Sequence, residues 1–438
     1  MQKFSYTVSK IQMREQILNL TSQHSSFAVL DSCAPVSFVN IPGKYDLIAG
    51  LGIHKSVSVN QNALQQLQSF LEDKENVNHW KFGFLSYDLK NEIENLSSEN
   101  RDAIQFPLLH FFVPEIVIVL KDDIVEIECY SNKTSAESVF QKIISSNKQT
   151  NNSNSNIEFE LPSATDYCNI IEKIKYHLHR GDIYEMNYCI QLLQQCEIEP
   201  LNVYKRLTEY SPAPYSCFAR INNQYLMSAS PERFIAKEKT KIFSQPMKGT
   251  SKRSDSKGED ENLKQQLQQS EKERAENVMI VDLVRNDLSR IAKRGSVKVD
   301  ELFSVYTFPR VHQMVSTISA ELRDEINFTD IIKAMFPMGS MTGAPKVRAM
   351  QLIEEFENFN RGIFSGSVGY INPEGDFDFN VVIRSIIYNS QTKQLSIPVG
   401  SAITAKSDAM QEYNECILKA QGMLKALGMN ETNSDIEK

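Results

Sequence analysis

Two pairs of glutamates have the spacing of a metal site. Glu273 and Glu276 lie one helical turn apart in EKERAENVMIVDLVRNDLSR, and Glu412 and Glu415 repeat that spacing in QEYNECILKA. Side chains three residues apart on a helix point to the same side, and carboxylates that close repel each other unless a cation or water separates them. One such pair is typical of a solvated first turn. Two pairs that face each other would hold a hard divalent cation, and magnesium suits because it needs only a few carboxylates.

Other side chains in the same part of the chain could complete a site for a small anionic substrate. They are Glu232, Lys248, His312, Thr342, Tyr370, Arg384 and Lys419. Arg384, Lys419 and the Thr342 loop could bind carboxylates, and the remaining residues offer hydrogen-bond donors, an amine and an acid. Together with a cation they indicate a metal-assisted site with a nucleophile or base nearby. Composition alone does not distinguish this site from a structural acidic surface.

The glutamates and the Thr342 loop are positioned by helices. Apolar residues at a period of about 3.6 predict a helix over 271–290, and a last helix over 408–428 carries the second pair and Lys419. The loop MGSMTGAP separates two further helices, so its backbone amides can approach an anion at the start of the second one.

Short apolar runs broken by Gly, Pro, Asn and Asp predict antiparallel strands elsewhere. Residues 110–130 are expected to form two strands around a turn at 121–123, and residues 215–250 three strands with Glu232 and Lys248 at strand ends. His312 lies in a predicted strand pair over 297–322. Residues 363–371, 377–389 and 394–403 are expected to form three strands that carry Tyr370, Arg384 and the Gly400 turn.

The chain divides into two halves by composition. Residues 1–145 form a strand-rich half, and the polar stretch 146–156 lacks any apolar period and is expected to be a linker or surface loop. Residues 157–428 contain every candidate for chemistry, and 429–438 form a polar tail.

Composition excludes several classes of function. The 438 residues are 41% hydrophobic and carry a net charge of -8, with no basic tract of the kind that binds nucleic acid. No apolar run is long enough to span a membrane, and the N-terminus lacks the apolar core of a signal peptide. The seven cysteines are scattered without a paired motif. We therefore expect a cytoplasmic protein with reduced thiols and without nucleic-acid or membrane partners.

The chain resembles the chorismate-utilising enzymes, which include anthranilate, isochorismate, salicylate and aminodeoxychorismate synthases. The motifs that carry the resemblance are SASPERF, QPMKGT, ERAENVMIVDLVRNDLSR, FPMGSMTGAPKVRAMQLIEE, FSGSVGY, FNVVIRS and EYNE with Lys419, in order over about residues 160–425. FAVLDS and GFLSYDL extend it more weakly into the N-terminal half. The resemblance implies an α+β fold of two packed, intertwined, mainly antiparallel sheets, with helices outside and a central active-site cleft.

The resemblance also implies roles for individual residues. Magnesium would be held by Glu273, Glu276, Glu412 and Glu415 and would grip the ring carboxylate of chorismate. Substrate would be surrounded by Gly249, Thr250, His312, Thr342, Tyr370, Arg384, Gly400 and Lys419.

Position 248 is what distinguishes the members of the family. Lysine stands there in aminodeoxychorismate synthases, as in this chain, whereas the other members usually have alanine. Glu185 occupies the position of the water-activating lysine of isochorismate and salicylate synthases, and of a glutamine in ammonia-using members. Addition of water is therefore disfavoured. Glu185 departs from the family pattern, and so do Ala402, where glycine is usual, and Lys406, where aspartate is usual.

The implied reaction joins chorismate and ammonia to give 4-amino-4-deoxychorismate, on the way to p-aminobenzoate and folate. Lys248 would attack C2 of the ring, Glu232 would protonate the departing C4 hydroxyl, and ammonia would then expel the lysine. Ammonia is expected from a separate glutamine amidotransferase subunit. Two alternatives stay open: an anthranilate synthase component I, and a catalytically degenerate subunit that binds chorismate.

Overall fold

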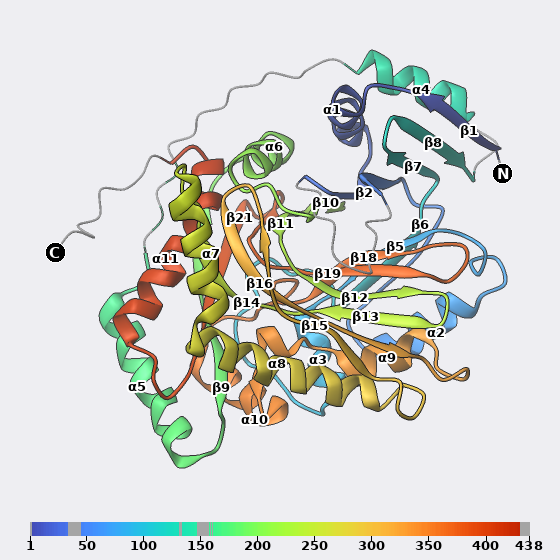
Figure 1. Cartoon of the computed structure of the whole chain (residues 1–438). Coiled ribbons are helices and arrows are strands. Elements are labelled where there is room, and N and C mark those ends of the chain that lie inside the picture. Colours follow the sequence, from blue (N-terminus) through green and yellow to red (C-terminus); the bar gives the residue numbers. More distant parts are fainter. Residues whose placement is uncertain are drawn as a thin grey trace.

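Two antiparallel sheets lie face to face at the centre of the molecule, with helices outside them (Figure 1). The computed structural model describes residues 2–33, 45–130, 134–146, 157, 159 and 161–429. The expected α+β architecture of two packed sheets is confirmed, and the helix expected over 271–290 is present as α8 (Glu271–Ser289).

The first sheet has 11 strands. Their spatial order is β1 (Gln2–Thr7), β8 (Ile124–Cys129), β7 (Ile116–Lys121), β3 (Leu47–Leu51), β2 (Ser26–Asp31), β10 (Tyr215–Ile221), β11 (Gln224–Ser230), β20 (Ser385–Asn389), β21 (Gln394–Ile403), β9 (Glu185–Gln195) and β17 (Gly343–Ala344).

The second sheet has 10 strands. The order is β14 (Met247–Lys252), β16 (Val311–Glu321), β13 (Lys241–Gln245), β12 (Arg233–Glu238), β19 (Phe377–Val381), β18 (Ser367–Ile371), β5 (Lys81–Leu85), β6 (Leu109–Val113) and β4 (Lys55–Val59), and β15 (Lys298–Thr307) pairs with β16.

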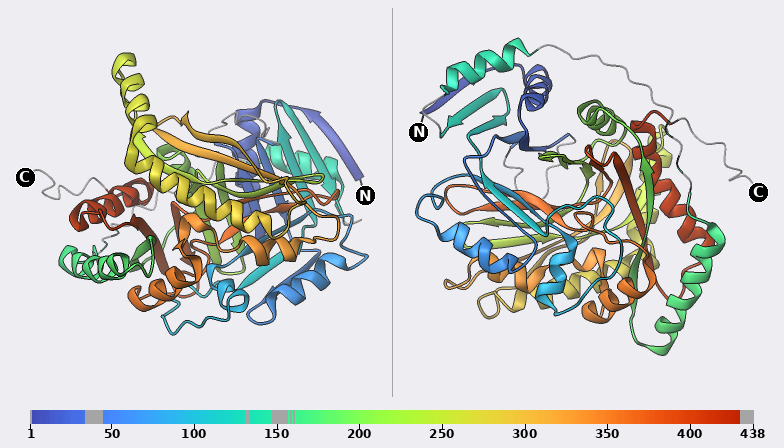
Figure 2. Two further views of the ribbon diagram at one scale, coloured as in Figure 1. Left: turned by 60° about the horizontal axis from the view of Figure 1, so that its bottom comes forward. Right: turned by 180° about the vertical axis from the view of Figure 1, so that it is seen from behind.

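The helices cover the outer faces of both sheets (Figure 2). Besides α8 they are α1 (Lys10–Leu20), α2 (Ala63–Glu72), α3 (Lys90–Ile93), α4 (Ala136–Ser145), α5 (Ala164–Arg180), α6 (Pro200–Tyr210), α7 (Lys257–Gln269), α9 (Phe328–Met335), α10 (Lys346–Phe356) and α11 (Ala409–Ala426). Three 3-10 turns complete the list: η1 (Thr21–Gln23), η2 (Tyr87–Leu89) and η3 (Gly339–Met341). Helices α5, α6 and α11 pack on the first sheet, while α8 packs on the second.

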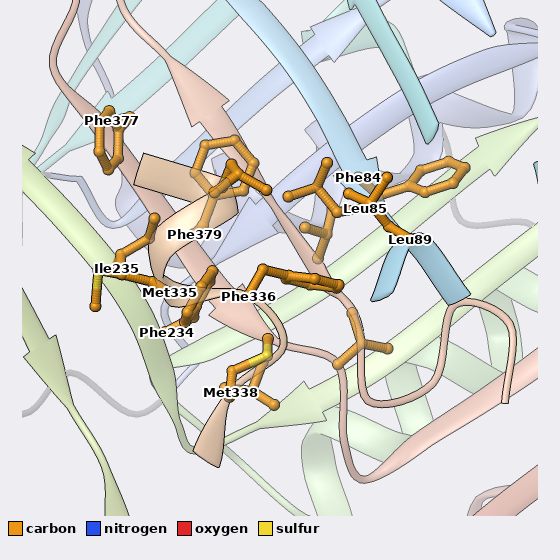
Figure 3. Packing of buried hydrophobic residues seen from close by; sticks show 14 of the residues in the cluster. Phe84, Leu85, Leu89, Phe234, Ile235, Met335, Phe336, Met338, Phe377 and Phe379 are labelled. Atoms are coloured by element: carbon orange, nitrogen blue, oxygen red, sulfur yellow. The ribbon is translucent and has the colours of Figure 1, made fainter. Parts of the chain in front are cut away.

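The main core fills the space between the two sheets, and a second core lies under the helices on the first sheet. Strand β7 shows how one strand serves both, because Val117 and Val119 enter the first core while Ile116, Ile118 and Leu120 enter the second. Successive side chains of a strand point to opposite faces. A strand buried on both faces therefore reads as a continuous apolar run. Figure 3 shows part of the main core, where aromatic residues of β5, β12 and β19 meet the chain after α9.

Three sequence expectations were wrong about strand number. Residues 110–130 form three strands rather than two, because the chain leaves the second sheet after β6 at Pro114 and joins the first sheet as β7. Residues 215–250 form five strands rather than three, with breaks at Pro231 and Pro246, since proline cannot donate to a strand ladder. Residues 377–389 form β19 and β20, one in each sheet.

The two halves of the chain are interleaved. Both sheets contain strands from residues before 130 and strands from residues after 184. The expected boundary over 146–156 lies almost wholly outside the described residues, as does the expected tail over 429–438. Among the helices of the described residues, none combines the length and apolar composition needed to span a bilayer.

Candidate active site

The first glutamate pair lies at the beginning of α8. Ser270 caps this helix, because its Oγ accepts a hydrogen bond from the Glu273 backbone N–H at 3.4 Å. Glu273 is half-buried and Glu276 is buried. Acidic side chains are stabilised at this end of a helix by its positive dipole. The second pair has the same setting at the beginning of α11, where Asp408 is the cap.

A lysine lies between the two pairs. The Nζ atom of Lys272 is 4.0 Å from Glu276 Oε1 and 3.9 Å from Glu412 Oε1. Burial lowers the pKa of Lys272, but the four glutamates outweigh burial and raise this pKa above its ordinary value. The Lys272 ammonium group therefore interacts electrostatically with every member of both pairs: Glu276, Glu412, Glu273 and Glu415. The N-terminal parts of α8 and α11 therefore approach each other at the ammonium group of Lys272, whose side chain is 58% exposed.

The four carboxylates are unequal in charge. Burial raises the pKa of Glu273 and Glu412 above the ordinary value, and it raises that of Glu276 to about 7. Burial also opposes ionisation of Glu415, but Lys419, which is 2.6 Å away, outweighs it and lowers the pKa. Such raised values are expected where acids are crowded without a matching cation.

These carboxylates fit a divalent cation by their chemistry. Within the described residues no group of three or more acidic, histidine or cysteine side chains already has the arrangement of a metal cage. However, Glu276 Oε1 is buried and has no hydrogen-bond partner. A buried acceptor without a donor is costly, and carboxylate oxygens are the ligands that magnesium prefers. A cation bound at Glu276 Oε1 would replace the positive charge that Lys272 now supplies from 4.0 Å away.

Lys248 lies on β14 where the pairing with β16 is irregular. Met247 pairs with Val315 and Thr250 pairs with Gln313, so the register shifts around Lys248 and Gly249. Bulges of this kind re-aim side chains and are frequent next to active sites. Here the side chain of Lys248 is turned inward, and only 10% of it is exposed.

The Lys248 amine forms an ion pair with Glu185 at the beginning of β9. Its Nζ atom is 2.7 Å from Glu185 Oε1, and the Glu185 side chain is fully buried. Burial lowers the pKa of Lys248, but Glu185, Glu276 and Glu232 outweigh it, so the pKa is raised overall. The other oxygen, Glu185 Oε2, is buried and has no hydrogen-bond partner.

Glu232 is a buried acid that holds its proton more strongly than an ordinary glutamate. It follows Pro231 at the beginning of β12, and its side chain is buried. Burial raises its pKa to about 7, against the lowering effects of Ser340 and Lys248. The Ser340 hydroxyl donates to Glu232 Oε1 at 2.6 Å. A small cavity borders this carboxyl group and is also lined by Asp287 and Met338.

Gly249 and Thr250 connect the lysine strand to the first glutamate pair. Gly249 has a φ of 82°, and a Cβ atom there would lie 2.9 Å from Glu273 Oε2. Only glycine adopts this conformation readily, and its size lets the carboxylate approach the backbone. Thr250 is exposed and pairs with Gln313.

Thr342, Gly400 and Lys419 surround the same region from the other sheet. Thr342 is buried after η3, and its carbonyl accepts from the Asn187 backbone N–H on β9 at 2.8 Å. Lys419 on α11 donates to the Gly400 carbonyl on β21 at 2.8 Å. Lys419 also pairs with Glu415 at 2.6 Å, so it joins Gly400 to the second glutamate pair. The expected turn at Gly400 was wrong, because this residue lies inside β21 and pairs with Cys189.

Arg384 lies where the chain crosses from one sheet to the other. Its φ is 50°, between β19 and β20. Burial lowers the pKa of its guanidinium group, and Glu415 partly opposes this. In the described part of the chain, no hydrogen bond or ion pair holds this guanidinium group. Such a group is available to bind an anion.

His312 is in contact with α7 instead of an open site. Its Nε2 is 3.0 Å from Asp260 Oδ1, and its Nδ1 is 3.0 Å from Thr307 Oγ1. Arg253 also binds Asp260 and, with Ser254, holds the pKa of that carboxyl group well below its usual range. Substrate could reach His312 only if the α7 contact opened.

Tyr370 is separated from the other candidates by its contacts. Its ring packs against Tyr45, Trp80 and Phe82, with centroids 5.9, 5.6 and 6.5 Å away. It lies on β18, whose neighbours are β5 and β19. The structure therefore brings the other predicted residues toward one region, but not Tyr370, because the alternation of side chains on β18 directs this ring into the aromatic core.

Sequence reasoning assigned no site role to several residues that contact the predicted ones. They are Glu185, which was noted only as a departure, and Lys272, Asp260 and Ser340. Lys272 directly precedes Glu273, so its position beside an acidic pair was a usable signal. The contacts of Asp260 and Ser340 cross from one element to another, and no spacing in the sequence marks them. Of the other departures, Ala402 pairs with Asn187 on β9, and Lys406 is exposed.

Comparisons with known proteins show which sequences this chain is similar to. A family model described as chorismate binding enzyme matches residues 35–425. Aminodeoxychorismate synthase component 1 of Bacillus subtilis (strain 168) is 33% identical over 370 residues, which is 81% of this chain and 78% of the relative. Anthranilate synthase component 1 of Aquifex aeolicus (strain VF5) is 36% identical over 270 residues, which is 62% of this chain and 54% of the relative.

Solved structures share the fold at low identity. Anthranilate synthase component I from Streptococcus pneumoniae TIGR4 has a TM-score of 0.76 at 24% identity, covering 89% of this chain and 94% of that chain. MenF, the menaquinone-specific isochorismate synthase from Escherichia coli, has a TM-score of 0.76 at 15% identity, covering 97% and 94%.

Proposed function

Because the chain belongs to the family of chorismate-binding enzymes, we propose that it is an aminodeoxychorismate synthase component 1. It would convert chorismate and ammonia to 4-amino-4-deoxychorismate, which leads to p-aminobenzoate and folate. The observation that carries this proposal is a buried amine, Lys248, held beside two buried carboxyl groups, Glu185 and Glu232. Against the effect of burial, the carboxyl groups raise the pKa of Lys248, so the amine becomes a covalent nucleophile only after it has given up a proton.

Binding of the substrate carboxylates would fall to cationic groups of the chain. Arg384 has a guanidinium group without a hydrogen-bond partner among the described residues, and Lys419 lies on the helix of the second glutamate pair. Glu273, Glu276, Glu412 and Glu415 would hold magnesium. When bound, this ion would neutralise carboxylate charge and withdraw electrons from the ring.

In the proposed first step, Lys248 loses a proton and its nitrogen forms a bond to C2 of the ring. Both ring double bonds shift, the C4–O bond breaks, and Glu232 protonates the hydroxyl so that water departs. The proton lost by Lys248 replaces the one that Glu232 gave. The raised pKa of Glu232, about 7, leaves about half of this acid protonated at neutral pH, whereas an ordinary glutamate would be ionised.

In the second step, ammonia forms a bond to C4, both double bonds shift back and the bond between C2 and Lys248 breaks. We propose that a separate glutamine amidotransferase subunit supplies the ammonia, because relatives named component 1 imply a second component. Free ammonium salts should support the reaction when that subunit is missing.

The test is product identification by mass from chorismate, ammonium and magnesium. Wild type should form aminodeoxychorismate, and Lys248→Ala should form none while retaining its fold and its affinity for magnesium. Without ammonium, wild type should gain the mass of chorismate less water, and Lys248→Ala should not. Turnover retained by Lys248→Ala would reject the covalent role. Fluorescent anthranilate as the product would establish the rival activity, which the Aquifex aeolicus relative represents.

A further inference from the structure

One carboxylate oxygen of Glu185 is hydrogen-bonded, and the other is buried without a hydrogen-bond partner within the part of the chain that the structure describes. Oε1 binds the Lys248 amine at 2.7 Å, whereas Oε2 is buried and lacks a hydrogen-bond partner among the described residues. The exposed fraction of Glu185 is 0%. Leaving a charged acceptor buried and unpaired costs more than a typical hydrogen bond contributes. A donor is therefore missing at Oε2, beside the proposed nucleophile.

The main chain at Glu185 is held by close contacts with the neighbouring strand. Glu185 begins β9 and pairs with Ala344 on β17. Gly343 packs so closely that a Cβ atom there would lie 2.1 Å from the Glu185 carbonyl oxygen. Two residues along β9, the Asn187 backbone N–H donates to the Thr342 carbonyl. These contacts fix the backbone from which the Glu185 side chain projects, and the side chain itself is held by its hydrogen bond to Lys248.

Negative charge dominates this place. Lys248 faces Glu185 and Glu276, with Glu232, Glu273 and Glu415 also acting on its charge. Glu276 on α8 and Glu185 repel each other, and Glu276 Oε1 also lacks a hydrogen-bond partner, with Lys272 no closer than 4.0 Å. Lys248 is the single cation paired with Glu185 in the described structure. A small cation with N–H donors would satisfy the free oxygen, and ammonium is such an ion.

We propose that Glu185 binds an ammonium ion through Oε2 and transfers one of its protons to the departing nitrogen of Lys248. This role rests on the proposed function and assigns its second step to one carboxylate. The two oxygens of Glu185 would then contact the incoming and the outgoing nitrogen at the same time.

The proton count of the second step closes with this assignment. Ammonium gives one proton to Oε2, and the resulting ammonia forms the bond to C4. The bond between C2 and Lys248 breaks, its electron pair stays on the lysine nitrogen, and that nitrogen takes a proton from Glu185. Glu185 returns to a carboxylate paired with the Lys248 ammonium, which is the state in the structure, and the product carries the new ammonium group.

The test uses the full chain with magnesium, chorismate and ammonium chloride, and the variant Glu185→Gln. An amide cannot transfer the proton, so at neutral pH the KM for ammonium should rise at least about tenfold, the loss expected for a hydrogen bond to a charged group. The defect should shrink at alkaline pH, where free ammonia is present. The KM for chorismate should stay within about twofold of wild type.

A second readout separates this role from a structural one. Removal of the Glu185 charge lowers the pKa of Lys248, so the first step should persist while the second slows. Intact-mass spectra of Glu185→Gln with ammonium present should therefore show accumulated Lys248 adduct. Glu128→Gln, the same change at a buried glutamate on β8, is the matched control and should behave as wild type.

The outcomes distinguish this inference from the proposed function. An unchanged KM for ammonium and no adduct in Glu185→Gln would overturn the ammonium site while leaving the function in place. If wild type formed no aminodeoxychorismate, the ammonium site would be tested without turnover, by comparing melting temperatures in ammonium chloride and in sodium chloride. Stabilisation specific to ammonium, lost in Glu185→Gln, would uphold the site without the reaction. Equal melting temperatures in both salts would reject it.

Discussion

Protonation of Glu232 sets the expected pH dependence of the reaction. Its pKa is about 7 because burial disfavours the carboxylate, whereas its ordinary value is 4.5. The proposed acid is active in its protonated form, so kcat/KM for chorismate should fall as pH rises through about 7. Glu232→Gln, which cannot give a proton, should lose activity at every pH while binding chorismate. Rates measured across this range at saturating magnesium would check both expectations, and a rate that keeps rising through pH 7 would contradict the role.

The same carboxyl group should affect stability. A pKa raised in the folded chain stabilises the fold fully below the unfolded value of 4.5, and this contribution is lost as pH rises through about 7. Relative to wild type, Glu232→Gln should therefore gain stability between about pH 5 and pH 8, by up to about 3 kcal/mol. Urea unfolding at the two pH values measures this gain. If the difference in unfolding free energy between Glu232→Gln and wild type were the same at about pH 5 and about pH 8, Glu232 would not be buried as a neutral acid.

Lys272 should compete with a metal ion for the glutamate pairs. Its ammonium group is 4.0 Å from Glu276 Oε1 and 3.9 Å from Glu412 Oε1, so a divalent cation there must displace it. Lys272→Gln should bind magnesium roughly tenfold more tightly by titration calorimetry, as loss of a competing charge of about 1.4 kcal/mol predicts. Lys257→Gln, the same change at an exposed lysine on α7, is the control and should leave the affinity for magnesium unchanged. Glu276→Gln should abolish binding, and weaker binding by Lys272→Gln would contradict the competition.

At the scale of elements, a buried ion pair after α10 connects the strand of Glu185 to the Thr342 loop. Arg361 donates to the carbonyls of Met341 and Asn187 at 2.7 and 3.0 Å, and it pairs with Glu357, which accepts from the Cys189 backbone N–H. This guanidinium group thus joins η3, α10 and β9. The geometry around Glu185 depends on residues that do not touch the proposed substrate.

Removal of that guanidinium group should be costly. Arg361→Met leaves the Glu357 carboxylate buried without a counter-charge, so the free energy of unfolding should fall by about 3–5 kcal/mol. The double variant Glu357→Gln with Arg361→Met should recover part of this loss, because the stranded charge is gone. Urea unfolding of the single and double variants provides the measurement. A single variant within about 1 kcal/mol of wild type would show that water reaches Glu357.

At the scale of the whole molecule, the interleaved sheets make the two halves interdependent. Strand β2 pairs with β10, and β5 pairs with β18, so the catalytic residues 157–428 complete their sheets only with strands from the first half. Residues 157–429 produced alone should not give a cooperative unfolding transition, because β10 and β18 would expose unpaired edges and apolar faces. Circular dichroism during heating would show this. A cooperative transition would mean that the halves are independent domains.

The sequence by itself determined the elements and the chemical inventory. Apolar periodicity located α8, α11 and the pair β15–β16, and one-turn spacing identified both glutamate pairs, because these features depend on neighbours within a few residues. It misplaced strand breaks at Pro231 and Arg384, where an apolar run continues while the chain changes sheet. Tyr370 was assigned by its residue type and by the family resemblance, and neither reveals which face of β18 it occupies.

Only the tertiary structure decided which groups meet. The ion pair of Lys248 with Glu185, the contact of Ser340 with Glu232 and the place of Lys272 between two helices join residues from separate elements. Their charge states follow from burial, which depends on the packing of both sheets and not on local composition. A lysine and a glutamate 63 residues apart become a buried ion pair only because β9, second from one edge of the first sheet, lies beside β14 at the edge of the second sheet.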